Sequence, residues 1–313
     1  MSRLYEKNRD LSRPIERLEL TVQAEEEGRF DQFLAARLQW RSRTGARKLI
    51  EQGLATIGGE QRKPSSKVRE GDVVIILVER QDEGPEPEPP PIEVLFEDEH
   101  MMALNKASGT VVHPVGVHQR GTLLQELHRR FEGKPLPKLA HRLDQYTSGV
   151  LLIAKSDAVR TAFSDMLEVG KVGKVYEALV MGRIEWDEKD VRAPIGAAGD
   201  SRILMNVGAE SGKEAHSRFS VLARSPFATH VQVEIFTGRT HQIRVHAAHL
   251  GHPLLGDHLY GDGIPVGRFE RFALHARRTR FPHPITHDSM EVTAPLPPDF
   301  VDALDLLHLA TDG

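Results

Sequence analysis

The sequence predicts an α+β protein: a large domain on a mainly antiparallel sheet with flanking helices, preceded by a small N-terminal α/β domain. Three observations support this prediction. An acidic, proline-rich stretch, QDEGPEPEPPP at 81–91, divides the 313-residue chain into a short and a long part. Downstream of it, strand and helix patterns do not alternate as regular βαβ units. No glycine-rich phosphate loop follows a predicted strand, which disfavours a doubly wound parallel sheet.

The composition along the chain predicts four segments. They are a tail at 1–14, a small domain at 15–80, a linker at 81–91 and a large domain at 92–313. Proline and like charges both oppose packing, so the linker should be extended and fairly stiff. Eight acids and no lysine or arginine fall within residues 81–100, which places the acidity of the chain at this boundary.

The small domain is expected to contain two helices, a hairpin and one buried strand. Apolar residues at helical spacing in RFDQFLAARL (29–38) predict the first helix. The second runs through TGARKLIEQG and ends at Gly53, a residue typical of helix C-termini. The pair Gly58-Gly59 indicates a hairpin turn, and GDVVIILV (71–78) has the pattern of the closing strand.

The formal charge of −4 for the whole chain conceals a basic segment. Residues 29–80 carry eleven Lys/Arg against six Asp/Glu, a net charge of +5. Five cations lie on or between the two predicted helices: Arg37, Arg41, Arg43, Arg47 and Lys48. Any one of them is most simply a solvated side chain, but the cluster favours a phosphate-binding surface. The pattern of residues 29–78 resembles the small RNA-binding domain of a small-subunit ribosomal protein and many RNA-modifying enzymes, which implies docking on structured RNA.

The large domain shows clear strand and helix patterns. Alternating or continuous apolar residues predict strands at 150–154, 174–182 and 230–238. SDAVRTAFSDMLEVG (156–170) predicts an amphipathic helix that begins at Ser156 or Asp157. RTHQIRVHAAHLG (239–251) predicts another, with Thr240 as the N-cap and Gly251 as the terminator.

One carboxylate stands at the start of a predicted buried strand. In HRLDQYTSGVLLIAK (141–155), Asp144 follows Arg142 by two residues and precedes a Thr-Ser-Gly turn and the apolar run 150–154. An aspartate in such a place is commonly a turn or capping residue. The nearby arginine and the rigid strand behind the loop favour a functional role instead, as does Tyr176, a polar aromatic on the face of another strand.

Histidines and arginines are concentrated in residues 237–261, and a metal site is one interpretation. His246, His249 and His252 are spaced by three and drift around a helix, and the zinc pattern of two histidines at i and i+4 with a neighbouring Glu is absent. We therefore predict no metal and expect a polar or RNA-facing surface, with some of the histidines packed structurally. Arg244 lies in the first turns of the helix, where an anionic partner is favoured.

Four motifs, taken in order, resemble the RluA-type pseudouridine synthases. They are HRLDQYTSGVLLIAK, KVYEALV (174–180), TGRTHQIRVHAAHLGHPLLGDHLYG (237–261) and LHARRTRFPHP (274–284). The resemblance spans about Ile92 to Phe300. It implies isomerisation of uridine to pseudouridine within an RNA chain, with no metal or cofactor.

The resemblance also implies roles for individual residues. Asp144 matches the family's essential aspartate, and Arg244 the arginine that pairs with it. Tyr176 matches the tyrosine that stacks on the target base and is a candidate for helping to remove the C5 proton. Arg142 matches an arginine that takes part in displacing the target base, and Lys106 in LNKASG matches a family loop, so both are expected to bind substrate. Apart from the resemblance, Arg239 and His241 of the polar segment 237–261 are expected to bind substrate too. Ala107 stands where proline is usual, and QYT replaces Lys-Asp-Thr after the aspartate. These departures concern loop stiffness or substrate contacts, and so the choice of target.

The residue types suit this chemistry. Breaking an N-glycosidic bond and re-forming it at carbon needs a carboxylate that acts as nucleophile or acid–base. A guanidinium partner keeps such a carboxylate ionised where it is shielded from water. An aromatic side chain in a closed pocket retains the base after it leaves the stack. Because the product keeps every atom of the substrate, no second substrate is required.

Other functions stay open at the level of sequence. An RNA base glycosylase would use similar residues and release the base. A non-catalytic RNA-binding or ribosome-assembly factor and a metal hydrolase are further alternatives. For a synthase, large-subunit rRNA is the first expected substrate and tRNA the second.

The remaining composition indicates the setting of the protein. There are no cysteines, which excludes disulfides and thiolate metal sites. No apolar run approaches the length of a membrane span, and the N-terminus lacks the apolar segment of a secretory signal. These features predict a cytoplasmic protein, and we expect a monomer.

Overall fold

The computed structural model describes residues 17–38, 43–77, 88–113, 120–132, 136–199, 204–209, 212–265 and 269–309. They form two compact units. The first comprises the described part of 1–90 and of 113–136, and the second the described part of 91–112 and of 137–313. In these ranges, no helix has the length and apolar character needed to cross a membrane.

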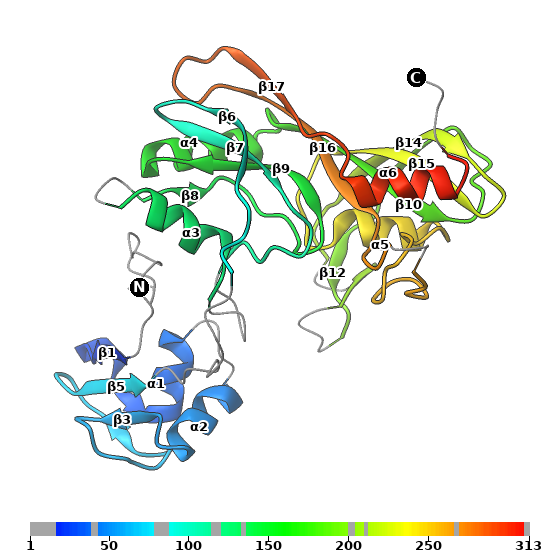
Figure 1. The fold of residues 1–313 in the computed structure, drawn as a ribbon. Helices are drawn as coiled ribbons and strands as arrows, with labels where there is room; N and C mark the ends of the chain where they lie inside the picture. Colours follow the sequence, from blue (N-terminus) through cyan, green and yellow to red (C-terminus); the bar gives the residue numbers. More distant parts are fainter. Residues whose placement is uncertain are drawn as a thin grey trace. The chain divides into compact units, whose positions relative to one another are not determined.

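The first unit holds two helices against a three-stranded sheet (Figure 1). The helices α1 (Phe30–Arg37) and α2 (Arg43–Glu51) confirm the two predicted from apolar spacing. The sheet has the order β1 (Arg17–Thr21), β5 (Val73–Leu77), β3 (Ala55–Ile57). The unit also contains η1 (Ala24–Glu26), β2 (Gly28–Arg29), β4 (Lys67–Val68) and a third helix, α3 (Leu123–Arg130).

Two glycine predictions in this unit are confirmed, and one pairing differs. Gly53 follows α2 with a φ of 75°, the left-handed conformation of a helix C-cap. Gly58 and Gly59 also have positive φ and form a tight turn closed by a single bridge between Ile57 and Glu60. The strand before the turn, however, pairs with β5 rather than with the residues after the turn. The predicted hairpin is therefore only a turn.

Among the described residues, ten strands form the sheet of the second unit, in the order β11-β14-β15-β10-β16-β9-β7-β6, with β17 beside β16 and β8 beside β9. All pairings are antiparallel except that of β16 with β9, which confirms the predicted fold class. The strands are β6 (Glu93–Glu97), β7 (Met101–Lys106), β8 (Lys138–Leu139), β9 (Ser148–Ala154), β10 (Gly173–Met181), β11 (Glu188–Arg192), β14 (His216–Arg224), β15 (Ala228–Ile235), β16 (Leu274–Pro282) and β17 (Ser289–Thr293).

The single parallel contact depends on one glycine. Gly149 in β9 lies opposite Ala276 in β16 and has a φ of 105°. A Cβ at this position would lie 2.2 Å from the carbonyl oxygen of Ala276, a distance that no side chain permits. Glycine therefore allows β16 to approach β9 just where the 141–147 loop enters the sheet.

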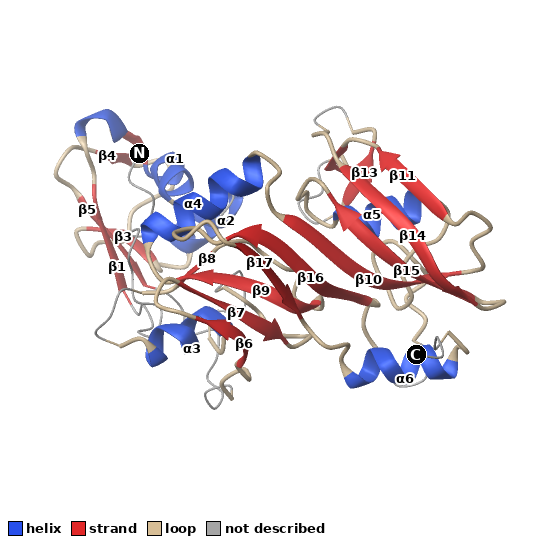
Figure 2. Ribbon diagram, turned by 90° about the horizontal axis from the view of Figure 1, so that it is seen from above, coloured by secondary structure: helices blue, strands red, loops and turns tan. Residues whose placement is uncertain are grey.

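Three helices cover this sheet. Helix α4 (Asp157–Glu168) begins as predicted, with the Ser156 hydroxyl accepting from the amide of Val159. Helix α5 (Gln242–His249) packs on the face of β10 that carries Tyr176. Helix α6 (Pro298–Leu306) packs against Leu179. Because successive strand residues point to opposite faces, α5 and α6 cover opposite sides of the sheet, as Figure 2 shows.

The start of α5 corrects one prediction. His241 rather than Thr240 is the N-cap residue, and its φ of 55° lies in the left-handed region. No side chain caps the helix there; instead the Gln242 side chain accepts from the Arg239 amide and the Thr237 hydroxyl. A Thr-based cap would leave His241 in helical conformation, so the left-handed turn redirects the histidine side chain.

Candidate active site

The predicted aspartate lies on the loop between β8 and β9 of the second unit. Asp144 begins a turn that is closed by a hydrogen bond from the Thr147 amide to the Asp144 carbonyl oxygen (3.1 Å). Its carboxylate is about one third exposed, at 32%. Immediately after the turn, all seven residues of β9 are buried. The carboxylate is therefore partly open to solvent on a loop with a rigid support.

Lys106, at the end of β7, holds this loop from behind. Its Nζ donates to the carbonyl oxygens of Ala107 (3.0 Å), Gln145 (2.6 Å) and Thr147 (2.8 Å). The residue is only 2% exposed. Burial lowers the pKa of Lys106 to about 7, with Arg271 lowering it further and Asp144 raising it. Three acceptors match the three ammonium hydrogens, so the side chain is fully engaged by the loop.

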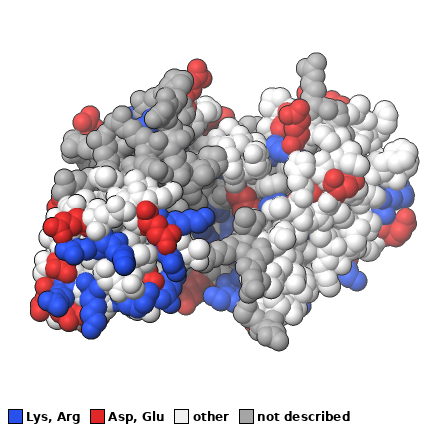
Figure 3. All heavy atoms as spheres, turned by 90° about the horizontal axis from the view of Figure 1, so that it is seen from below, with Lys and Arg blue, Asp and Glu red and all other residues white. Residues whose placement is uncertain are grey.

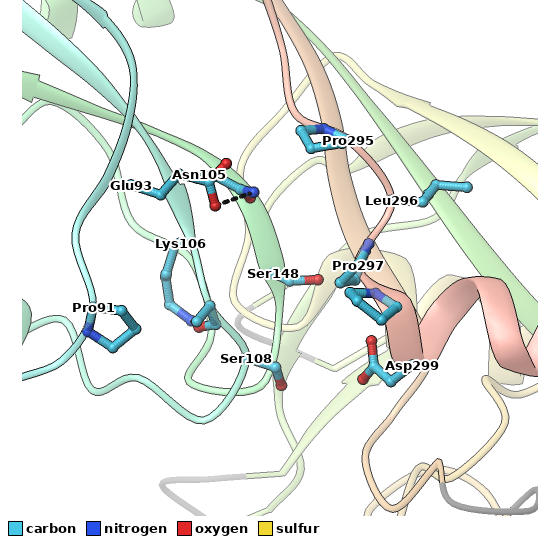
Figure 4. A pocket seen from close by; sticks show the side chains of 12 residues that line it. Pro91, Glu93, Asn105, Lys106, Ser108, Ser148, Pro295, Leu296, Pro297 and Asp299 are labelled. Carbon is cyan, nitrogen blue, oxygen red and sulfur yellow. Dashed lines mark hydrogen bonds between the residues drawn. The ribbon is translucent and has the colours of Figure 1, made fainter.

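A pocket of about 370 Å³ lies beside this lysine (Figure 4). Lys106 and Ser108 are on one side of it and Pro297 and Asp299 on the other.

The Ser108 hydroxyl donates to the Tyr146 carbonyl oxygen (2.9 Å), and Gly109 and Gln145 exchange two further hydrogen bonds of 3.1 Å. The segment after β7 is thus fastened to the Asp144 loop along its length.

Arg271 anchors the loop from the opposite end. Its Nη1 donates to the Tyr146 carbonyl oxygen (3.1 Å) and its Nη2 to the Ser148 hydroxyl (3.3 Å). The guanidinium is itself held by Asp299, through Nε–Oδ2 at 2.7 Å and Nη2–Oδ1 at 3.1 Å. Two buried basic side chains, Lys106 and Arg271, therefore fix the backbone on which Asp144 stands.

Arg244 is held mainly by a carboxylate that the sequence did not single out. Its Nε and Nη2 both donate to Asp257, each at 2.7 Å, in a bidentate pair. Burial tends to raise the pKa of Asp257, but the hydrogen bonds and charge of Arg244 outweigh it and hold that pKa below its usual value. The remaining nitrogen, Nη1, faces Asp144 Oδ2 at 3.8 Å. Arg244 therefore presents one guanidinium edge to the predicted aspartate while the other is occupied.

Aromatic rings surround the same guanidinium. Its Cζ lies 4.1 Å from the ring centre of Phe272 and 5.0 Å from that of Tyr260. Cation–π attraction and the Asp257 pair together fix the plane of the group. Arg244 is 4% exposed, so its direction toward Asp144 is set by packing rather than by solvent.

Tyr176 lies on the face of the sheet that α5 covers, in the core cluster between this helix and β10. The side chain is 7% exposed and packs with Phe272, Ile243 and Val233. Burial raises the pKa of the Tyr176 hydroxyl, and the charge of Asp144 raises it further. The phenol is therefore neutral at physiological pH, and its ring belongs to the apolar cluster against which Leu143, the neighbour of Asp144, packs.

His241 completes the group around Asp144. Its Nε2 faces Asp144 Oδ2 at 4.0 Å, and its Nδ1 lies 2.8 Å from the hydroxyl of Tyr260. Burial lowers the pKa of His241, with Arg244 acting in the same direction and the neighbouring carboxylates opposing them. The imidazole is consequently neutral near pH 7.

The predicted residues are thus only partly brought together. Asp144, Tyr176, His241 and Arg244 form one group, and Lys106 lies behind the loop. Arg142 and Arg239 are exposed, and the Nε of Arg239 donates to the Glu214 carbonyl oxygen (2.8 Å). The residues missed by sequence reasoning are Asp257, Tyr260, Arg271, Phe272 and Asp299. Asp257 and Tyr260 stand in the motif 237–261. The available signal was Asp257 itself, an acidic residue in the largely apolar stretch PLLGDHLYG (253–261).

Two other histidines of that segment, His246 and His252, have structural partners. His246 is buried, with Nδ1 3.0 Å from the Ser217 hydroxyl and Nε2 3.0 Å from the Ala193 carbonyl oxygen. His252 Nδ1 lies 2.8 Å from the Met181 carbonyl oxygen. Across the described ranges, no three His, Asp or Glu side chains gather as metal ligands would.

The predicted cations of the first unit divide into two kinds. Arg37 is 11% exposed and forms an ion pair with Glu26 at 2.7 Å. Arg43, Arg47 and Lys48 are exposed on α2, although Arg47 also contacts Glu51 (2.7 Å) and Arg43 contacts Asp31 (3.3 Å). Figure 3 shows Lys and Arg interspersed with acids over the visible face of this unit. Arg41 lies outside the described residues.

Comparison with known proteins identifies the class. A family model described as RNA pseudouridylate synthase matches residues 100–249, and one described as S4 domain matches 28–74. The "Ribosomal large subunit pseudouridine synthase D" of Pseudomonas aeruginosa is 37% identical over 296 residues, covering 90% of this chain and 92% of the relative. An "Uncharacterized RNA pseudouridine synthase" of Bacillus subtilis is 34% identical over 308 residues, covering 94% and 99%.

A solved structure supports the same assignment. "Human RNA Pseudouridylate Synthase Domain Containing 1" has a TM-score of 0.58 and 27% identity, over 70% of this chain and 90% of that one. The fold and the relatives define an RNA-modifying isomerase with an S4 domain. The chain belongs to the RNA pseudouridylate synthase family, which confirms the resemblance found in its sequence motifs.

The anchoring of the loop leads to a first prediction. Replacing Lys106 with Met removes three hydrogen bonds to the loop while keeping its length and burial. We expect the rate of a single turnover to fall about 100-fold, because a displacement near 1 Å of a reacting group has that effect. RNA affinity should change little. Asn105→Ala is the matched control, since that neighbouring side chain bonds Glu93 instead. A loss confined to RNA affinity would show that Lys106 acts by binding substrate.

Proposed function

We propose that this enzyme converts uridine to pseudouridine in RNA by means of Asp144, without a cofactor, and that its substrate is large-subunit rRNA. The observation that carries the proposal is the convergence on one aspartate of a buried arginine, a neutral histidine and a buried tyrosine ring. A carboxylate so placed has a cation and a potential hydrogen-bond donor close to its ionised form, and an apolar cluster beside it for a base.

Each residue has a distinct part in this proposal. Asp144 attacks the flipped nucleotide or moves its proton, and Arg244 stabilises the negative charge of the carboxylate and of the detached base. Tyr176 supplies the surface on which the base rests while it rotates. Its neutral, buried phenol suits stacking better than proton abstraction.

The choice of RNA rests on relatives and on the first unit. The relative from Pseudomonas aeruginosa is named for the large ribosomal subunit, and the S4 domain adds a basic RNA-binding module. These support rRNA over tRNA as the substrate. A glycosylase is the nearest alternative reaction, and it would release uracil rather than keep it. A binding factor without catalysis would have no use for a carboxylate beside RNA phosphates, because the charges repel.

Tritium release tests the reaction and the substrate together. RNA labelled at uridine C5 loses its tritium when pseudouridine forms. We expect release from rRNA by the full-length protein, much less from tRNA, and no free uracil in either reaction. Release from tRNA alone would overturn the substrate, and free uracil would replace the isomerase with a glycosylase.

The cations of the first unit supply a second prediction, for RNA binding. Arg47 and Lys48 project from α2 into solvent, whereas Arg37 is turned toward Glu26. We expect Arg47→Ala with Lys48→Ala to weaken rRNA binding and to lower the slope of log K against log salt by about 1.5, as two lost phosphate contacts would. Arg37→Ala should lower the stability of the unit and leave that slope unchanged. An equal salt dependence of binding in the wild type, the Arg47→Ala with Lys48→Ala variant and Arg37→Ala would exclude α2 from the RNA interface.

A further inference from the structure

The hydroxyl of Tyr260 lies between a backbone amide and the imidazole of His241. The amide of Met205, in β13 (Met205–Val207), donates to the phenol oxygen at 3.0 Å. On the other side, the same oxygen is 2.8 Å from His241 Nδ1. The two rings meet edge to face, with their centres 5.7 Å apart. Tyr260 therefore links the hairpin of β12 (Ile195–Ala197) and β13 to the histidine nearest Asp144.

The neighbours of the Tyr260 hydroxyl favour one direction for the hydrogen bonds that join Met205, Tyr260 and His241. An amide only donates, so the phenol oxygen accepts from Met205. The phenol has one proton of its own, and His241 Nδ1, at 2.8 Å, is placed to accept it. A neutral imidazole that accepts at Nδ1 carries its single proton on Nε2. His241 is neutral because burial lowers its pKa.

The Nε2–H so defined points at the reactive carboxylate from just beyond hydrogen-bond distance. Nε2 lies 4.0 Å from Asp144 Oδ2, and Arg244 Nη1 lies 3.8 Å from the same oxygen. Both distances exceed a hydrogen bond, and catalytic contacts of this kind often tighten only when substrate is present. An oxygen atom of the substrate beside Asp144 would be within reach of both donors.

We propose that Tyr260 is a positioning residue that fixes His241 as the Nε2–H tautomer, so that His241 donates to an oxygen of the flipped uridine beside Asp144. The inference deepens the proposed function and rests on it for the identity of the acceptor. The donor stabilises negative charge as it develops on the detached base. Met205, Val207 and Tyr260 all pack against the small cluster that contains Val245, so the docked hairpin helps to hold Tyr260 in place.

The backbone of His241 permits a sharp test of the donor. At a φ of 55°, asparagine is tolerated better than glutamine, so a purely structural role predicts that His241→Asn retains more activity than His241→Gln. The proposal predicts the reverse order, because the glutamine amide nitrogen reaches the position of Nε2 and the asparagine nitrogen that of Nδ1. We expect His241→Gln to retain about tenfold more of the single-turnover rate than His241→Asn.

The tautomer itself is measured without any activity assay. Nitrogen-15 NMR of the full-length protein distinguishes a protonated from an unprotonated imidazole nitrogen, and the His241→Gln spectrum identifies the signals of His241. We expect protonation at Nε2 in the wild type and a mixture in Tyr260→Phe, which keeps the ring beside Arg244. Protonation at Nδ1 in the wild type would overturn the inference, whatever RNA the enzyme modifies.

A double-mutant cycle completes the test. We expect Tyr260→Phe to slow the single turnover about tenfold with RNA affinity changed less than about twofold, and to have no further effect in a His241→Leu background. Additive losses from the two substitutions would show that Tyr260 acts independently of His241, and the proposal would fail. Loss of turnover in Asp144→Asn, run in parallel, checks the proposed function separately.

Discussion

Asp144→Asn should abolish turnover while leaving RNA binding nearly intact. The substitution preserves the size of the side chain and removes the charge that Arg244 and His241 face at 3.8 and 4.0 Å. An amide is neither a nucleophile nor a base of the required strength, so we expect the rate to fall at least about 10⁴-fold. Single-turnover tritium release on rRNA measures the rate, and filter binding measures the affinity.

The control for this experiment lies on the same loop. Tyr146 is exposed and holds the loop through its backbone carbonyl oxygen, so Tyr146→Phe should fold normally and keep every anchoring contact. Its turnover should stay within about threefold of the wild type, as expected of an exposed substitution. Substantial turnover by Asp144→Asn would mean that another group performs the chemistry.

The second large effect is expected from the buried pair of Arg244 and Asp257. Asp257 is fully buried, and Arg244 is 4% exposed. Asp257→Leu leaves a buried guanidinium without its bidentate partner, which should lower the free energy of unfolding by about 3–5 kcal/mol. It should also release Arg244 from its direction toward Asp144, so turnover should fall even at temperatures where the variant is folded. Urea unfolding and single-turnover rates measure the two effects.

A double variant separates stability from catalysis. In Arg244→Met with Asp257→Leu, both charges are replaced by apolar side chains, a change that is often close to neutral for stability. We expect this protein to recover most of the unfolding free energy lost by Asp257→Leu and yet to remain inactive. Recovery of activity together with stability would show that Arg244 is needed only for folding.

Local patterns predicted much of this structure. The helices α1, α2 and α4 and the strands β9, β10 and β15 follow from apolar spacing, which records the side of each element that faces a core. The antiparallel class followed from the absence of regular βαβ units. Helix α5 was predicted too, but its N-cap was not, because His241 takes a left-handed conformation there and no side chain caps the helix.

The supports of the site could not be read from the sequence in the same way. Lys106 reaches carbonyl oxygens 39 and 41 residues away, and Arg271 reaches one 125 residues away. No periodicity records such pairings, since they arise only when the sheet brings β7, β9 and β16 together. Arg37 illustrates the same limit, because an ion pair with Glu26 is invisible in the charge pattern that placed it with the surface cations.

The most direct test of the account is the fate of the uracil in a single reaction. Large-subunit rRNA carrying [¹⁴C]uridine is incubated with the full-length enzyme in a buffer that contains a chelator, then digested to nucleosides and separated. We predict labelled pseudouridine with no free uracil from the wild type, and unchanged uridine from Asp144→Asn. Free uracil, a requirement for metal, or pseudouridine formed by Asp144→Asn would each contradict the proposed chemistry.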